Sequence, residues 1–234
     1  MRKWAPRMSE QIAIEIAAGH KVGATVYPAA KPKQFGVTLI LGHGAGAGQS
    51  SAFMVSFATA LAARGIDTVT FNFSYMEQGR RLPDSKDKLE ACYRAVIETV
   101  ARRQGGRGRL AIGGKSMGGR IASQVAAAGA PEVAGLVLLG YPLHPPGKRD
   151  QLRDKHLPQI KAPMLFVQGS RDTFGTPPEL APILKKLKAP AELYEVAGGD
   201  HSFKVLKSAD VPQADVYKAI QDRIDQWLRA TVAT

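Results

Sequence analysis

Cysteine is almost absent from the sequence, which has one such residue, Cys92, among 234. A single cysteine cannot form an intramolecular disulfide, and it cannot supply a thiolate metal cluster. We therefore expect a protein of the reducing cytoplasm.

Long hydrophobic runs are also missing. No stretch approaches the roughly 18 uninterrupted apolar residues that a membrane-spanning helix needs. No apolar segment of signal-peptide length follows the basic start MRKWAPRMSEQ. The sequence accordingly predicts neither a membrane protein nor a secreted one.

Acidic residues are in the minority, because 20 Asp and Glu stand against 32 Lys and Arg, a formal net charge of +12. Such a charge could reflect an anionic partner. The basic residues are, however, interleaved with acidic ones, and no aromatic residues accompany them in a base-stacking pattern. We expect a solvated basic surface rather than a nucleic-acid site.

Metal-ligand spacing is lacking around His20, His144 and His156, so neither a metal nor a cofactor is predicted.

The chain does contain a regular alternation of strands and helices. Two β-like runs, 12–19 and 23–28, predict a hairpin at the edge of a sheet. Apolar runs too hydrophobic for half-exposed strands follow at 37–44, 67–73, 109–114, 135–142, 163–170 and 191–199. Helices are predicted at 51–64, from Pro83 to about Val100, and at 117–129, 177–188 and 213–230.

This order predicts an α/β fold in which helices cover both faces of a doubly wound, mostly parallel sheet, giving three layers. We expect one domain, 1–234, without a separate cap domain. The irregular segment 143–161 is a short lid-like insertion that leaves the site beneath it open. It is basic, with Lys148, Arg149, Arg153 and Lys155, which could favour an acidic substrate, although a solvated loop is the preferred interpretation. His144 and His156 could border the pocket.

The sharpest motif is Gly114-Lys115-Ser116-Met117-Gly118, which lies between a predicted strand and a predicted helix. A serine on so sharp a turn projects its hydroxyl from the sheet edge, and the flanking glycines let strand and helix approach. The next N–H, that of Met117, would stabilise an anion beside Ser116. An incidental serine in a glycine-rich turn is the plain alternative. A phosphate-binding loop fails on spacing, because its first glycine would fall at Arg109.

Downstream residues supply the partners that a serine nucleophile needs. Asp172 follows one predicted strand and His201 follows the next, and Ser, Asp, His is the order of the α/β-hydrolase fold. Each could instead be an ordinary turn or surface residue. Asp200 is a competing carboxylate, but adjacent side chains rarely orient one another as a relay, so Asp172 is preferred.

The glycine-rich run from His43 to Gly48 also follows a predicted strand. It fits the loop that provides a second oxyanion N–H, for which we choose Ala45. A phosphate-cradling loop is the competing interpretation, but no convincing dinucleotide fingerprint accompanies it. His43 is interpreted as a structural residue rather than a base.

With HGAGAG, GKSMGG, GSRD and GGDHSF in place, the sequence resembles the α/β-hydrolase superfamily over nearly its whole length. In size and short lid it is similar to dienelactone-hydrolase-like proteins, although those enzymes use cysteine where this chain has Ser116. The phrases FNFSYMEQGRRLPD, GKSMGGR and GYPLHPPGKRDQLRDKHLPQI resemble a narrower branch that includes a testis-expressed protein and a scaffold subunit of a histone-acetyltransferase complex.

The resemblance implies a serine hydrolase that acts on a small-molecule ester or thioester through Ser116, His201 and Asp172. The alternative is a non-catalytic binding or scaffold protein on the same fold. Neither the natural substrate nor the oligomeric state follows from the sequence.

Overall fold

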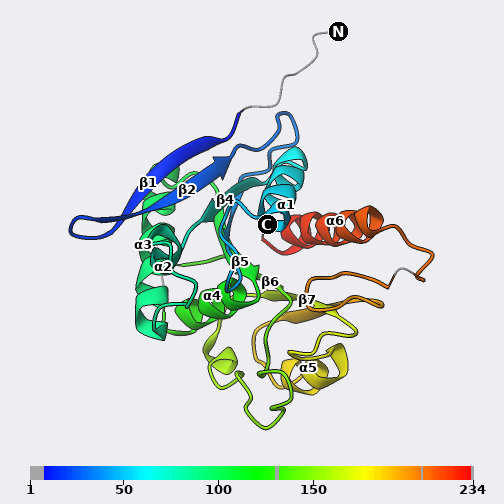
Figure 1. Cartoon of the computed structure of the whole chain (residues 1–234). Coiled ribbons are helices and arrows are strands. Elements are labelled where there is room, and N and C mark those ends of the chain that lie inside the picture. The colour runs from blue at the N-terminus through cyan, green and yellow to red at the C-terminus, as the bar shows by residue number, and fades with distance from the viewer. Residues whose placement is uncertain (1–7, 130–131, 207, 233–234) are drawn as a thin grey trace.

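The computed structural model describes residues 8–129, 132–206 and 208–232 and is built around one eight-stranded sheet (Figure 1). Its order is β1-β2-β4-β3-β5-β6-β7-β8, and all pairs from β4 to β8 are parallel. The strands are β1 (Glu10–Ala17), β2 (His20–Tyr27), β3 (Val37–Gly42), β4 (Asp67–Phe71), β5 (Arg109–Lys115), β6 (Gly135–Leu139), β7 (Met164–Gly169) and β8 (Ala191–Val196). The predicted mostly parallel α/β architecture is confirmed.

The two edges of the sheet differ from each other. At one edge β1 and β2 form the predicted antiparallel hairpin, and β2 joins β4. At the other edge β8 pairs only with β7 among the described strands, and most of its side chains are partly or fully exposed. The expectation that every apolar strand is fully covered is therefore wrong for β8, because an edge strand lacks a neighbour on one side.

Helices cover both faces of the sheet, which confirms the doubly wound prediction (Figure 1). One face packs against α1 (Ala52–Ala63) and α6 (Gln213–Thr231), and the other against α3 (Lys86–Gln104), α4 (Met117–Ala127) and α5 (Pro177–Leu184). The short helix α2 (Ser74–Glu77) was not predicted, and α5 ends about one turn early. Cys92 is buried on the apolar face of α3, as its spacing indicated.

The described residues form no separate cap domain. Residues 143–161 connect β6 to β7 and contain only a 3-10 turn, η1 (Leu157–Gln159). The carboxyl ends of the parallel strands all lie at the same end of the sheet. Ligands bind at this end in open α/β sheets. Among the described helices, none has the length and apolarity required to cross a lipid bilayer.

Candidate active site

Ser116 lies on the turn that joins β5 to α4, and its backbone is in an unusual conformation, with φ 50° and ψ −113°. Such a conformation is strained in a residue other than glycine and is found mostly at functional sites. The turn is this sharp because two glycines allow close approach. A Cβ on either Gly114 or Gly118 would lie 2.2 Å from the carbonyl oxygen of Gly42 in β3.

Tyr93 of α3 fixes the strand that leads into this turn. Its hydroxyl is completely buried and lies 2.6 Å from the Gly113 carbonyl oxygen, 3.0 Å from that of Ile40, and 3.1 Å from the Gly113 nitrogen, whose N–H donates to it. Burial raises the pKa of this phenol above its usual value, so the group stays neutral. A helix side chain thus ties β3 to β5 directly behind Ser116.

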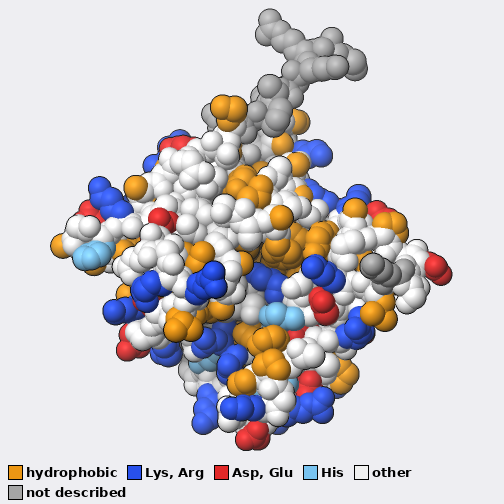
Figure 2. All heavy atoms as spheres, in the orientation of Figure 1, with side chains coloured by type: hydrophobic (Ala, Val, Ile, Leu, Met, Phe, Trp, Pro, Cys, Tyr) orange, Lys and Arg blue, Asp and Glu red, His pale blue; other side chains and the backbone are white. Residues whose placement is uncertain are grey.

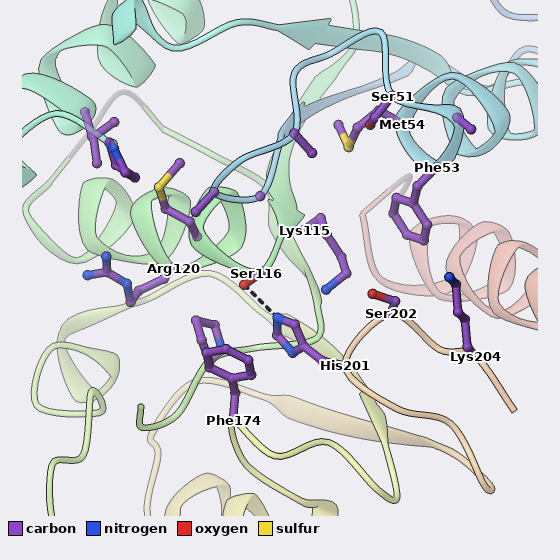
Figure 3. A pocket seen from close by; sticks show the side chains of 18 of the residues that line it. Ser51, Phe53, Met54, Lys115, Ser116, Arg120, Phe174, His201, Ser202 and Lys204 are labelled. Carbon is purple, nitrogen blue, oxygen red and sulfur yellow. Dashed lines mark hydrogen bonds between the residues drawn. The ribbon is translucent and has the colours of Figure 1, made fainter. Parts of the chain in front are cut away.

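His201 lies between Ser116 and Asp172. The Ser116 hydroxyl is 2.8 Å from Nε2 of His201 (Figure 3), and Nδ1 of the same ring is 2.8 Å from Oδ2 of Asp172. Because an ionised carboxylate only accepts hydrogen bonds, Nδ1 carries the ring proton and Nε2 is left to accept from the serine. The structure therefore brings together three side chains from three different strand ends, in the arrangement of a nucleophile, a base and an orienting acid.

Asp172 is buried, and its two oxygens have further partners besides His201. Oδ1 accepts the N–H of Phe174 at 2.8 Å, and Oδ2 accepts from Nε2 of Gln168 at 2.8 Å. Gln168, also fully buried, accepts the Tyr141 N–H at 2.8 Å and donates to the Gly175 carbonyl at 2.6 Å. The sequence reasoning missed Gln168, although a lone polar residue at the end of the apolar strand β7 was a usable signal.

Asp200, the competing carboxylate, has a different, structural role. Its Oδ1 accepts the N–H groups of Ser202 and Lys204, at 2.8 and 2.9 Å, and so closes the turn that carries His201. Phe203 continues this turn with a positive φ of 61° and a fully buried ring. From the other side the Phe174 ring lies against the His201 imidazole, with ring centroids 4.2 Å apart. The imidazole is therefore held by its neighbours as well as by Asp172.

The loop from His43 to Gly48 borders Ser116, and His43 anchors it. The His43 Nε2 accepts the N–H of Phe73 at 3.1 Å, which leaves Nδ1 to donate to the Gly44 carbonyl at 2.8 Å. The ring is completely buried, and this burial lowers its pKa. Both nitrogens are thus engaged in holding the loop, in agreement with the structural role assigned to His43.

A cavity of about 890 Å³ opens at Ser116. Ala45 and Met117 line it together with Ser116 and His201, and neither the Ala45 nor the Met117 N–H donates to another described residue. Figure 2 shows hydrophobic side chains gathered in the middle of this face, with lysines and arginines beside them. Figure 3 places Phe53 and Met54 on one side of Ser116 and Arg120 on the other.

Several cations line the same cavity and were not foreseen as site residues. Lys115 is half-buried with its ammonium 5.5 Å from the centroid of the Phe203 ring, and burial lowers its pKa to about 8 despite the nearby carboxylates of Asp172 and Asp200. Arg120 and Arg153 line the cavity as well. Of the four basic residues noted in 143–161, only Arg153 does so, and Arg149 instead pairs with Glu179.

The other histidines lie outside the cavity. His156 is hydrogen-bonded to the buried Ser123 at 2.7 Å, and burial, assisted by the charge of Arg120, lowers the pKa of His156 to about 4. His144 is buried beside Glu179, so neither histidine borders the pocket as the sequence had suggested. No group of three or more His, Cys, Asp or Glu side chains in 8–129, 132–206 and 208–232 is placed to hold a metal ion.

Comparison with known proteins shows similarity over nearly the whole chain. Residues 36–229 match the family model described as alpha/beta hydrolase domain. A serine hydrolase without a lid from Xanthomonas campestris is 22% identical, with a TM-score of 0.73 over 97% of this chain and 98% of that one. A dienelactone hydrolase from Anabaena variabilis is 19% identical, with a TM-score of 0.76 over 97% and 100%. An alpha-beta serine hydrolase homologue from Coxiella burnetii is 21% identical, with a TM-score of 0.73 over 94% and 97%.

Proposed function

The chain belongs to the alpha/beta hydrolase family, and from this premise we propose that it is a serine hydrolase that cleaves an ester or thioester of a small or medium-sized substrate. The observation that carries the proposal is the row of hydrogen bonds from Ser116 through His201 to Asp172 at the wall of an open cavity. A serine becomes nucleophilic when an oriented histidine can take its proton.

In the proposed acylation step, Nε2 of His201 takes the hydroxyl proton as Ser116 Oγ bonds to the substrate carbonyl carbon. The tetrahedral intermediate collapses when the bond to the leaving oxygen or sulfur breaks, and His201 gives its proton to that atom. Water then repeats the sequence on the acyl-enzyme, with His201 as base, and releases the acid and free Ser116. Asp172 stabilises the imidazolium in both steps.

The oxyanion of each intermediate would bind the N–H groups of Met117 and Ala45. The Met117 N–H opens α4, where the helix dipole favours negative charge. Ala45 lies on the loop that His43 fixes. Two preorganised donors of this kind contribute roughly 10²–10³ in rate each in other hydrolases. No step of this mechanism requires a cofactor.

The proposal extends to the setting of the enzyme. We treat residues 1–234 as one hydrolase domain with a small-molecule substrate, and we place it in the cytoplasm, where its one thiol, the buried Cys92, would stay reduced. The similar structures include Est1E from Butyrivibrio proteoclasticus, which was solved with ferulic acid bound, and an esterase from Pyrococcus furiosus. The name of the second protein is in keeping with an ester substrate.

The non-catalytic alternative follows from the narrower resemblance to scaffold proteins. A scaffold has no need of an accessible nucleophile, whereas here Ser116 faces a cavity and its base is already oriented. This difference favours catalysis.

Covalent labelling with a fluorophosphonate probe, read by intact mass, tests the proposal. We expect the native protein to gain one probe adduct, and Ser116→Ala and His201→Ala to gain none. Ser56→Ala is the matched control, because Ser56 lines the same cavity but lies on the exposed side of α1. It should label like the native protein. A folded native protein that stays unlabelled would contradict the proposed nucleophile and favour the scaffold.

A further inference from the structure

Two arginines that line the cavity come from segments fixed to the site. Arg120 lies in the first turn of α4, where its N–H donates to the Ser116 carbonyl at 3.0 Å. Arg153 lies in the connection between β6 and β7, where its N–H donates to the Leu143 carbonyl at 2.8 Å and its own carbonyl accepts the buried Tyr141 hydroxyl at 2.6 Å. The backbone of both arginines is therefore held in place beside the site.

Neither guanidinium has an adequate partner within the described part of the chain. Arg120 has one contact with the Gln124 side-chain oxygen at 3.5 Å, and Arg153 has one with the Pro142 carbonyl at 3.4 Å. Neither forms an ion pair with a described carboxylate. By contrast Arg64, which is also largely buried, bonds Asp222 at 2.7 Å. Both arginines are partly buried in the wall of the cavity, and charges that are removed from water are normally paired.

The two arginines also oppose each other. Both line the same cavity, and burial lowers the pKa of Arg120 while the charge of Arg153 lowers it further, although Tyr141 and Glu90 raise it. Of the described carboxylates in this region, Glu90 pairs with Lys86 at 2.9 Å and Asp84 pairs with Arg80, and neither they nor Asp154 forms an ion pair with the two arginines. An anion from outside would therefore meet two cations that have no ion pair with a described carboxylate.

The position of Arg120 indicates which half of a substrate would meet it. In Figure 3 Ser116 lies between Arg120 and His201. His201 must reach the leaving group to protonate it, so the leaving group lies on the His201 side of Ser116. We therefore place the acyl group on the other side of Ser116, toward Arg120.

Resting on the proposed serine hydrolase activity, we propose that the acyl group carries a carboxylate that binds between Arg120 and Arg153, so that the substrates are half-esters or half-thioesters of dicarboxylic acids. A guanidinium presents its N–H groups in a planar fork that matches both oxygens of a carboxylate. The bonds made and broken are those of the proposed reaction. The distal carboxylate stays unchanged, and the released product is a dicarboxylate.

The experiment compares mono-4-nitrophenyl half-esters of glutaric, adipic and pimelic acids with 4-nitrophenyl esters of the unbranched monocarboxylic acids of the same chain lengths. We expect kcat/KM to be at least about 10-fold higher for the best half-ester than for its uncharged counterpart, as loss of a hydrogen bond to a charged group usually costs this much. Added salt should reduce this preference.

Arg120→Gln and Arg153→Gln should each reduce the preference, expressed as the ratio of the two kcat/KM values, by roughly 10-fold or more. Arg149→Gln is the matched control. It removes a basic residue of the same segment, but Arg149 is 79% exposed, pairs with Glu179 and does not line the cavity, so the ratio should stay at the native value. The two arginine variants serve as independent checks should one of them fail to fold.

The outcomes separate this inference from the proposed function. Equal hydrolysis of charged and uncharged esters, or a ratio that is the same in Arg153→Gln and Arg149→Gln, overturns the carboxylate site and leaves the serine hydrolase intact. Labelling of Ser116 without hydrolysis of any half-ester also overturns it. A native protein that neither labels nor hydrolyses any of the esters removes the proposed function, and this inference with it.

Discussion

Asp172 contacts His201 and Arg120 follows Ser116 on α4, yet the protein surrounds these two charged groups in opposite ways. The carboxylate of Asp172 is buried and receives hydrogen bonds from a histidine, a glutamine and a backbone N–H. The guanidinium of Arg120 has one long contact with a neutral oxygen, and Arg153 lines the same cavity. The protein therefore supplies the partners of the carboxylate and leaves the guanidinium without an ionic partner among the described residues.

The difference indicates two kinds of preorganisation. Groups that act in every turnover, as we propose for Ser116, His201 and Asp172, are completed by the protein itself. Groups that would recognise a substrate lack a hydrogen-bond or ionic partner in the protein, because the ligand supplies that partner. Stability given up at a binding site in this manner is a common trade against function. Variants of both kinds of groups test this difference.

The largest effect is expected from Asp172→Asn. An asparagine can donate its NH₂ to Nδ1 of His201, which moves the ring proton to Nε2 and leaves no acceptor for the Ser116 hydroxyl. We expect kcat to fall by roughly 10³–10⁴-fold, in line with the same change in a serine protease. The measurement is kcat for 4-nitrophenyl ester hydrolysis at a pH where circular dichroism shows a folded protein.

Asp200→Asn is the control for that variant. Its carboxylate supports the turn of the His201 loop through Ser202 and Lys204 and makes no contact with the imidazole in the structure. We expect a loss below roughly 10-fold, because an asparagine oxygen can still accept both N–H groups. A loss equal to or larger than that of Asp172→Asn would mean that Asp200, and not Asp172, orients His201.

A smaller effect is expected from Gln168→Met, which nearly conserves volume but removes the amide. The Tyr141 N–H and the Gly175 carbonyl then lose a partner in a fully buried place, and Asp172 loses one of its donors. We expect a loss of about 2–4 kcal/mol in the free energy of unfolding, since each unsatisfied buried group costs about 1–3 kcal/mol.

The rate of fluorophosphonate labelling separates positioning from stability in this variant. Measured well below the unfolding temperature, it should fall by roughly 10–100-fold, because a less constrained Asp172 orients His201 less well. Gln221→Met on α6 is the control, as it removes another buried glutamine that does not line the cavity. A labelling rate in Gln168→Met equal to that control would show that Gln168 serves stability alone.

The sequence was sufficient for the doubly wound fold and for the positions of Ser116, Asp172 and His201 at strand ends, because these follow from apolar periodicity and from short motifs. It was not sufficient for Gln168, Arg120 and Arg153. Their importance depends on which side chains meet across β6, β7 and α4, and local spacing carries no information on such contacts. The exposure of β8 was missed for a similar reason, since strand order, rather than composition, decides which strand is the edge.

The smallest effect, and one of opposite sign, is expected from Lys115→Met. Because the pKa of Lys115 is about 8 in the folded protein against 10.5 for the free side chain, the folded state disfavours the ammonium. That destabilisation is fully present below pH 8, declines as the pH rises from 8 to 10.5, and is absent above. Replacing Lys115 by methionine should therefore raise stability at pH 7 by about 1–3 kcal/mol, or roughly 3–10 °C in Tm. The gain in stability should be smaller at pH 10.

The control is Lys204→Met, which changes an exposed lysine of the same cavity and should alter Tm little at either pH. A Lys115→Met protein that melts at or below the native Tm at pH 7 would mean that this cation is satisfied by its surroundings, and the contrast between completed and incomplete charges would then be confined to the two arginines.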